Sequence, residues 1–263
     1  MRISSGRNPI LQEIRRAALS GRMTAQGLIV AEGPHLLEEA LRSRWTVEEI
    51  VATPEARERH SRLVTRAQAA VTEVSERAFE TVATTETTQG VLALLRPREC
   101  AWSDLIGRET LLVILDGLQD PGNAGTIVRS AEAFGATGAV FLKGCVRVAN
   151  GKFLRATAGS ILRIPFLEGL TVPDLVASLA TENMPLYALS SRGELPITSA
   201  NLTGACALAV GSEAAGVSDE LLRSATPVCI PVHKVESLNA AVACSIALFE
   251  AARQRGEAKG ASG

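Results

Sequence analysis

The segment LLVILDGLQDPGNAGTIVRSAEAFGA, residues 111–136, decides the fold class. It opens with LLVILD (111–116), an apolar run of strand length, and continues through a glycine-rich turn. Apolar residues then recur at helical spacing, so that Ile127, Ala131 and Phe134 form one buried stripe. A buried strand, a turn and an amphipathic helix form the repeating unit of a parallel sheet. The pattern therefore predicts an α/β fold.

The same alternation continues through the C-terminal part of the chain. Its short, fully apolar strands indicate a parallel sheet with helices on both faces. Sheets of this kind bind ligands at the carboxyl ends of their strands. The predicted strands are 111–116, 138–142, 185–190, 207–211 and 227–232, and the predicted helices are 124–134, 152–161, 173–181, 217–223 and 238–254.

The first ninety or so residues predict a separate, small α/β domain. Its first helix, 8–19, turns an apolar face inward, whereas Arg15 and Arg16 point elsewhere. That face consists of Ile10, Leu11, Ile14 and Ala18. The other predicted elements are strands 27–33, 47–52 and 90–95 and helices 34–43 and 56–70. We therefore divide the chain into a domain at 1–95, a linker at 96–109 and a larger domain at 110–258.

Charge separates the two domains only slightly. The net charge of the chain is −1, and residues 1–98 contain 14 Arg and 12 Glu, a net charge of +2. Arginine can form two parallel hydrogen bonds with one phosphate. On charge alone, an ordinary solvated surface is the favoured interpretation. Aromatic residues make up only 3% of the chain, which argues against a base-stacking surface.

The cysteines and the N-terminus indicate a cytoplasmic protein. The five cysteines (100, 145, 206, 229 and 244) form no C-x-x-C pair and are not paired with His in sequence, so we expect buried thiols in a reducing compartment and no metal. No apolar run reaches membrane-spanning length, and the N-terminus MRISSGRNPI lacks the apolar stretch of a signal peptide.

The glycine-rich turn of 116–136 is the first candidate for chemistry. Its spacing matches neither the G-x-G-x-x-G dinucleotide fingerprint nor a phosphate-binding loop. Arg129 lies about 200° around the helix from Ile127, so it is free to reach a ligand at the strand ends. The alternative, which this segment alone favours, is that Arg129 is merely solvated and Asn123 merely caps the helix.

Two further segments carry polar residues beyond strand ends. In 208–222, Glu213 lies between Gly211 and Gly216, where it could bind a sugar hydroxyl or a cation. The equally weighted alternative is a glycine turn in which Ser218 caps the next helix.

In the third segment, 228–255, a strand stops at Pro231 and Ser237 stands where a helix N-cap belongs. The helix that follows is rich in alanine, which suits close packing against a second subunit. Taken alone, an ordinary core helix is the preferred interpretation. Its apolar stripe consists of Leu238, Val242, Ile246 and Phe249.

In this order and spacing, the three segments resemble one family. N-x-G-x-x-x-R-S-A-x-A-F-G, V-G-x-E-x-x-G-V-S and I-P-V-x-K-V-E-S-L-N-A-A-V-A are similar to the three motifs of the SpoU/TrmH RNA 2′-O-ribose methyltransferases, over residues 111–255. Asn8-Pro9, the strand end 30–33 and the segment 89–93 resemble the family's substrate-binding domain, which is similar to small ribosomal RNA-binding proteins.

The resemblance implies a SPOUT methyltransferase domain at 110–258 with a C-terminal trefoil knot, preceded by an RNA-binding domain at 1–95. It implies methylation of a ribose 2′-hydroxyl with S-adenosylmethionine as donor, and a homodimer formed through the knotted domain. The family's functional polar residues match Asn123, Arg129, Glu213, Ser237 and Asn239 here. The implied donor-binding residues are Leu189, Gly211, Ile230, Ser237, Leu238 and Asn239.

RNA is the implied partner, and the presence of the N-terminal domain favours 23S ribosomal RNA over transfer RNA. We expect Arg129 to hold the phosphate beside the target ribose, because an arginine side chain stays protonated and is a poor base. The expected RNA-binding residues are Arg7, Arg15, Arg22, Arg129 and Arg155.

The third motif departs from the family's I-P-M-x-G-x-x-E-S-L-N pattern. Here 230–237 is one residue shorter, lacks the glycine and has Val232 for Met. This departure keeps open the alternative of an RNA-binding protein with a degenerate donor site. A separate alternative keeps the chemistry but has transfer RNA as the target. A nucleotide-dependent oxidoreductase lacks both the glycine fingerprint and the acidic residue that it requires.

Overall fold

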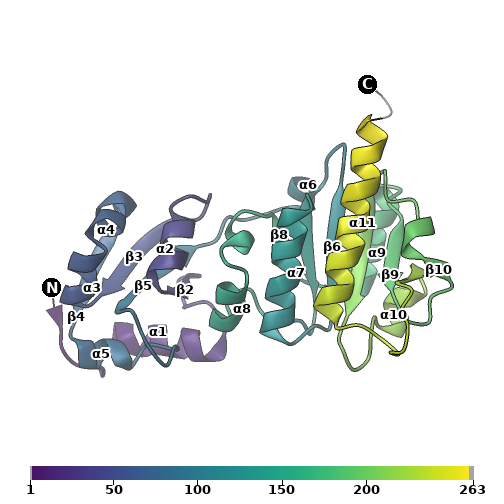
Figure 1. Cartoon of the computed structure of the whole chain (residues 1–263). Helices are drawn as coiled ribbons and strands as arrows, with labels where there is room; N and C mark the ends of the chain where they lie inside the picture. The colour runs from purple at the N-terminus through teal and green to yellow at the C-terminus, as the bar shows by residue number, and fades with distance from the viewer. Residues whose placement is uncertain (1, 261–263) are drawn as a thin grey trace. The chain divides into compact units, whose positions relative to one another are not determined.

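The computed structural model describes residues 2–260, which form two compact units. The first contains the residues up to Glu99 together with Arg147–Arg163, and the second contains Cys100–Val146 together with the chain from Ile164 onward. The elements of the first unit (Figure 1) are β1 (Arg2–Ile3), α1 (Pro9–Ser20), β2 (Ile29–Glu32), α2 (Pro34–Ala40), β3 (Thr46–Ala52), α3 (Pro54–Arg59), α4 (Ser61–Ala67), β4 (Ala70–Val74), α5 (Glu76–Glu80), β5 (Val91–Arg96), α8 (Gly151–Ala156) and η1 (Ser160–Leu162).

The first unit is built on a five-stranded mixed sheet in the order β1-β4-β3-β5-β2. The helix predicted over 56–70 is wrong in part, because α3 ends at Arg59, α4 ends at Ala67 and the chain then enters strand β4. Gln68 adopts a left-handed φ of 51°, which stops the helix and turns the chain into the sheet. The helix α1 covers the sheet with Leu11, Ile14 and Ala17, whereas Ile10 is 48% exposed, contrary to the predicted face.

The segment 147–163 folds with the first unit, although it lies in the middle of the larger predicted domain. The helix predicted over 152–161 is interrupted, because Ala158 and Gly159 adopt positive φ between α8 and η1. Gly159 is required there, since a Cβ atom would lie 2.6 Å from a carboxylate oxygen of the buried Glu39.

The second unit is built on a seven-stranded sheet in the order β10-β12-β9-β11-β6-β7-β8. Every pairing in it is parallel, as the apolar strands predicted. The edge strands β8 and β10 were not predicted. The elements are α6 (Trp102–Leu105), β6 (Leu111–Asp116), α7 (Pro121–Ala133), β7 (Gly138–Leu142), β8 (Phe166–Leu170), α9 (Val172–Thr181), β9 (Leu186–Leu189), β10 (Leu195–Pro196), η2 (Ile197–Ser199), β11 (Cys206–Gly211), α10 (Asp219–Leu222), β12 (Thr226–Cys229) and α11 (Ala240–Gly260).

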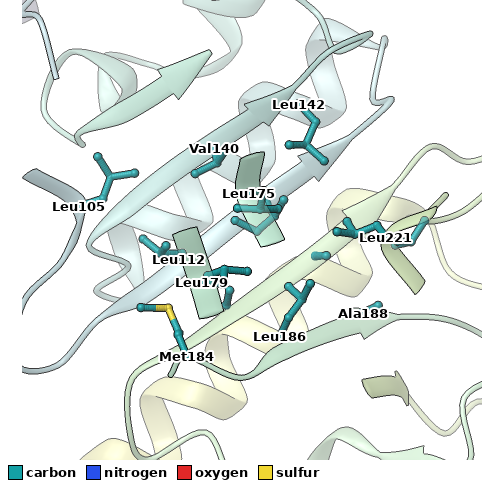
Figure 2. Close-up of a cluster of buried hydrophobic side chains, with 14 residues drawn as sticks. Leu105, Leu112, Val140, Leu142, Leu175, Leu179, Met184, Leu186, Ala188 and Leu221 are labelled. Atoms are coloured by element: carbon teal, nitrogen blue, oxygen red, sulfur yellow. The ribbon is translucent and has the colours of Figure 1, made fainter. Parts of the chain in front are cut away.

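Helices cover both faces of this sheet, as expected. Figure 2 shows one face, where Leu175 and Leu179 of α9 lie over Leu112 of β6 and Leu186 of β9. The opposite face is covered by α7 and α11, which pack against each other (Figure 1). The segment predicted as a linker contributes to the first of these cores, because Leu105 of α6 is fully buried in it.

The helix α11 turns a different face to the core from the one predicted. Of the predicted stripe, Val242 is 48% exposed, Ile246 is 37% exposed and Phe249 is 54% exposed. Small side chains are buried instead, because they let α11 approach α7 and β11 closely. The buried apolar residues of α11 are Ala240, Ala241, Cys244, Ala247, Leu248 and Ala251.

The five cysteines are free thiols, but only Cys206 and Cys244 are fully buried. Burial raises the pKa of Cys244 to about 12, so this thiol stays protonated and packs as a small apolar group. Among residues 2–260, no cluster of His, Cys, Asp and Glu could hold a metal ion. No helix within that range is long and apolar enough to cross a membrane.

Candidate active site

The site lies where the central strands β6 and β11 end side by side, with Gly211 paired to Asp116. A loop at 212–218 follows β11 and folds back on it, through a bridge between Ser212 and Gly216. A Cβ atom on Gly211 would lie 1.9 Å from the Gly216 carbonyl group, so only glycine permits this approach. Asp116 accepts a hydrogen bond of 2.7 Å from the Ser218 amide, which fixes the loop to the neighbouring strand.

Three side chains from separate motifs are joined by hydrogen bonds beside this loop. The Asn123 amide group, on α7, donates to the Glu213 carboxylate. The Asn239 amide group donates to the Asn123 Oδ1 atom at 3.1 Å. The structure therefore brings together three of the five predicted catalytic residues, Asn123, Glu213 and Asn239, from positions up to 116 residues apart.

The helix-capping roles considered for Asn123 and Ser237 are wrong. Asp120, not Asn123, caps α7, since the Asp120 side chain accepts a hydrogen bond from the backbone N–H of Asn123 at 2.7 Å. At the start of α11, Asn239 rather than Ser237 caps the helix, because its Oδ1 atom accepts from the Ala241 amide at 3.0 Å. Capping leaves the Nδ2 group of Asn239 free to bond Asn123, so one residue starts the helix and joins the network. Ser218 caps α10, as predicted by the alternative interpretation of segment 208–222.

A cavity of about 370 Å³ opens at the same strand ends. Five of the six residues predicted to bind the donor line it; Asn239 does not. Glu213 also lines the cavity, so the hydrogen-bonded network borders it directly. The predicted residues in its wall are Leu189, Gly211, Ile230, Ser237 and Leu238, and the apolar part of the wall also includes Val210, Val217 and Val228.

The cavity suits a cationic ligand of nucleoside size. Its volume is within the usual range of small-molecule sites. Its charged lining consists of the carboxylates Glu213, Asp219 and Glu236 and the guanidinium of Arg192. S-adenosylmethionine carries a sulfonium, an ammonium and a carboxylate, so its net charge is complementary to this lining, and its adenosine fits the apolar wall.

The shortened third motif forms a loop from 230 to 239 along one side of the cavity. Lys234 adopts a φ of 65° in it, a left-handed conformation that glycine adopts without strain. Lys234 thus adopts a left-handed conformation near the position at which the family motif has a glycine. The loop nevertheless brings Ser237 and Leu238 to the cavity.

The predicted arginines occupy four different places. Arg129 lies six residues beyond Asn123 on α7, exposed, and has no hydrogen-bond or ion-pair partner among residues 2–260, so it is not joined to the network. Arg7 and Arg15 line a groove of the first unit, whereas Arg22 is exposed outside it. Arg155 donates a hydrogen bond of 3.3 Å to the Thr84 hydroxyl group.

Sequence reasoning missed several residues of these sites. Ser190, Ser191 and Arg192 line the cavity directly beyond β9. The rule that ligands bind at the carboxyl ends of parallel strands could have included them, because that strand was predicted to end at residue 190. Arg16 and Arg77 line the groove together with Arg7 and Arg15. No sequence signal connects Arg77 with the other three, because only the folded sheet brings α5 near α1.

Two family models match the chain, one for each unit. The SpoU rRNA Methylase family matches residues 110–249, and the MRM3-like substrate binding domain matches residues 8–93. The first match covers more than half of the chain and includes the strand-end cavity and the network around Asn123. The chain therefore belongs to the SpoU rRNA methylase family.

Relatives resemble the chain along nearly its whole length. The 23S rRNA (guanosine(2553)-2′-O)-methyltransferase RlmP of Bacillus subtilis is 32% identical over 249 residues, which cover 94% of this chain and 97% of the relative. The AdoMet-bound rRNA methyltransferase from Sinorhizobium meliloti has a TM-score of 0.84 at 28% identity and covers 96% of this chain, with 97% of its own. The methyltransferase AviRb from Streptomyces viridochromogenes, also with AdoMet, has a TM-score of 0.86 at 22% identity, covers 95% of this chain and 98% of its own, and supports the fold alone.

These findings confirm the predicted family and fold: a parallel α/β sheet preceded by a substrate-binding domain. They also confirm the predicted activity, an S-adenosylmethionine-dependent RNA methyltransferase, with RNA as its partner. An oxidoreductase and a non-enzymatic RNA-binding protein are set aside accordingly.

Proposed function

We propose that this enzyme methylates a ribose 2′-hydroxyl group of 23S ribosomal RNA. The observation that carries the proposal is the hydrogen-bonded network of Asn123, Glu213 and Asn239, which borders a cavity suited to the donor. The relative RlmP is named for 2′-O-methylation of 23S rRNA, and it matches this chain over 94% of its length, both units included. The substrate-binding domain matched at 8–93 supports a structured RNA substrate.

S-adenosylmethionine, when bound, supplies a methyl group on a sulfonium leaving group. The wall formed by Leu189, Gly211, Ile230 and Leu238 holds the donor, and Ser237 binds a polar end of it. Asn123 and Glu213 are already fixed to each other, so we assign them to the incoming ribose. A hydrogen-bonded pair that need not reorganise on binding is an effective way to orient a nucleophile.

Arg129 acts as the clamp on the phosphate beside the target ribose. It is exposed and carries no ion pair within the described residues, so its guanidinium is available to RNA. A guanidinium close to the reacting oxygen stabilises the negative charge that develops as the hydroxyl loses its proton. The proton itself passes to the Glu213 carboxylate, which belongs to the network assigned to the ribose, because arginine stays protonated. Arg7, Arg15, Arg22 and Arg155, all in the first unit, bind other phosphates of the RNA.

The decisive experiment compares 2′-O-methyl groups in ribosomal and transfer RNA from a deletion strain and its parent. We expect one ribose in 23S RNA to lose its methyl group, and purified enzyme with S-adenosylmethionine to restore it on RNA from the deletion strain. Loss of a transfer RNA methyl group instead would move the enzyme to that substrate. Calorimetry that detects no heat with S-adenosylmethionine would mean a degenerate donor site. A ribosomal RNA substrate places the enzyme in the cytoplasm.

The enzyme works as a homodimer through α11. Its exposed stripe of Val242, Ile246 and Phe249 continues into Phe134, the C-cap residue of α7, whose ring meets Phe249 edge-on at a centroid distance of 5.8 Å. Exposed apolar patches of this kind commonly mark subunit contacts. Light scattering should give the mass of a dimer, and Phe249→Glu should yield monomers. The control Leu19→Glu, at a site that is 67% exposed in the first unit, should remain dimeric. A monomeric parent protein would contradict the assignment.

The C-terminal segment forms the trefoil knot of SPOUT enzymes. Strand β12 lies beyond β9 in the sheet, whereas α11 packs on α7 and β11. The chain therefore crosses back over the sheet end after β12, as a knotted path requires.

A further inference from the structure

A groove of about 640 Å³ on the first unit gathers four arginines from three segments of the chain. Arg7 precedes α1, Arg15 and Arg16 lie on α1, and Arg77 lies on α5. All four are exposed, and none of the four guanidinium groups has an ion-pair or hydrogen-bond partner among residues 2–260. The lining residues include no Asp or Glu within that range.

Several other arginines of the same unit form ion pairs. Arg42 pairs with Glu38 at 2.6 Å, Arg57 pairs with Glu73 at 3.2 Å, and Arg59 pairs with Glu55. An ordinary solvated surface in a chain with nearly equal numbers of Arg and Glu would mix the two signs in this way. The groove therefore differs from its surroundings in having cations alone.

Backbone contacts hold the three segments of the groove in place. Strand β1 pairs with β4, and the Ser75 amide, at the start of α5, donates to the Ile3 carbonyl group at 3.0 Å. The turn that carries Arg7 then closes on α5, where a Cβ atom on Gly6 would lie 2.7 Å from the Thr81 side chain. The cations are consequently held near one another before any ligand binds, despite their mutual repulsion.

We propose that this groove binds the phosphate backbone of the RNA substrate, with Arg16 and Arg77 among its contacts. The inference rests on the proposed function in taking RNA as the polyanion. An open groove with four exposed guanidiniums favours a polyanion over one small anion, because several contacts form at once and release counterions together. No aromatic residue of the described chain lines the groove, so its side chains contact RNA phosphates and do not stack on bases.

The test is the salt dependence of binding to a short, labelled RNA hairpin. The double variant Arg16→Gln/Arg77→Gln should bind more weakly, and its slope of log affinity against log salt should fall by about two, about one for each phosphate contact. The control Arg57→Gln/Arg59→Gln removes the same charge from paired arginines and should keep the parent slope. Arg16→Lys/Arg77→Lys should retain most of the slope, since charge is the main requirement.

Far-UV circular dichroism and thermal melting show whether the first unit of each variant is folded. Calorimetry with S-adenosylmethionine serves as a second control, because the donor cavity lies in the other unit and its affinity should stay unchanged. If the double variant keeps the parent slope of log affinity against log salt and still transfers methyl groups, the proposal that the groove binds RNA is wrong, and the proposed function is unaffected. Failure of the parent protein to methylate RNA, while the groove variants still lower its RNA affinity, overturns the proposed function alone. A parent protein that binds no RNA overturns both.

Discussion

The donor cavity and the arginine groove recognise their ligands in opposite ways. At the cavity, polar side chains are bonded to one another, and backbone shape is fixed by close contacts such as that of Gly211 with Gly216. At the groove, four guanidiniums have no such partners within the described residues. The first arrangement selects one small molecule by shape, whereas the second attracts a long polyanion by charge.

This difference has a measurable consequence. Binding at the cavity should depend weakly on salt, because it uses apolar contacts and short-range hydrogen bonds. Binding at the groove should weaken steeply as salt rises, because it releases counterions. Arg129 is the exception, since it is an unpaired cation on the unit that holds the donor. The largest predicted effect therefore concerns Arg129, which is an unpaired cation like those of the groove but lies on the unit that holds the cavity.

Arg129→Ala should lower kcat by about 10²–10³-fold, the usual cost of removing one donor that stabilises developing charge. Donor affinity should be nearly unchanged, because Arg129 does not line the cavity. Single-turnover methyl transfer and calorimetry measure the two quantities separately.

Arg129→Lys distinguishes two ways in which a clamp could work. Partial activity is expected, because lysine keeps the charge but cannot form two parallel hydrogen bonds with one phosphate. Undiminished turnover in Arg129→Ala would remove this residue from the mechanism.

Gly211→Ala should weaken donor binding by roughly tenfold to a hundredfold. The new methyl group would meet the Gly216 carbonyl group at 1.9 Å, so the loop beyond β11 must move, at a cost typical of overpacking, about 1–3 kcal/mol. RNA affinity and its salt slope should stay at parent values. Gly204→Ala is the matched control, because a Cβ atom there has no neighbour within 4 Å. Equal donor affinity in the two variants would mean that the loop adapts freely.

Asn239→Ser separates the two roles of Asn239. Serine can still cap α11, so the melting temperature should stay near the parent value, but its side chain is too short to bond Asn123. We expect about a tenfold loss of kcat, the upper range for one hydrogen bond. Asn239→Ala should lose the same activity and also about 0.5–2 kcal/mol of stability from the missing cap. Full activity in the serine variant would show that the bond to Asn123 has no catalytic role.

The predictability of the two regions differs for the same physical reason. Asn123 and Glu213 follow buried strands, and Asn239 stands at the start of a helix, each within a motif of fixed spacing, so a local pattern points to each of them. Arg77 carries no such pattern, since its neighbours in the groove are fixed by the pairing of β1 with β4. Strand β4 was missed because 56–70 looks helical until the left-handed Gln68. The face of α11 was misassigned because the period of apolar residues alone does not tell a core face from an exposed apolar stripe.

The smallest predicted effect comes from the shortened loop of the third motif. A non-glycine residue in the left-handed region costs about 1–2 kcal/mol, while the greater freedom of glycine in other conformations of the loop offsets about 0.5–1 kcal/mol of the relief. Because Lys234 has a φ of 65°, Lys234→Gly should tighten donor binding only about two- to fivefold by favouring the loop conformation that lines the cavity. Lys234→Ala removes the same charge but keeps the strain, so it should show no gain. If alanine and glycine improve donor affinity equally, the charge of Lys234 and not its backbone conformation limits donor affinity. Charge would then matter at the cavity as well as at the groove, and the two sites would differ less in how they recognise their ligands.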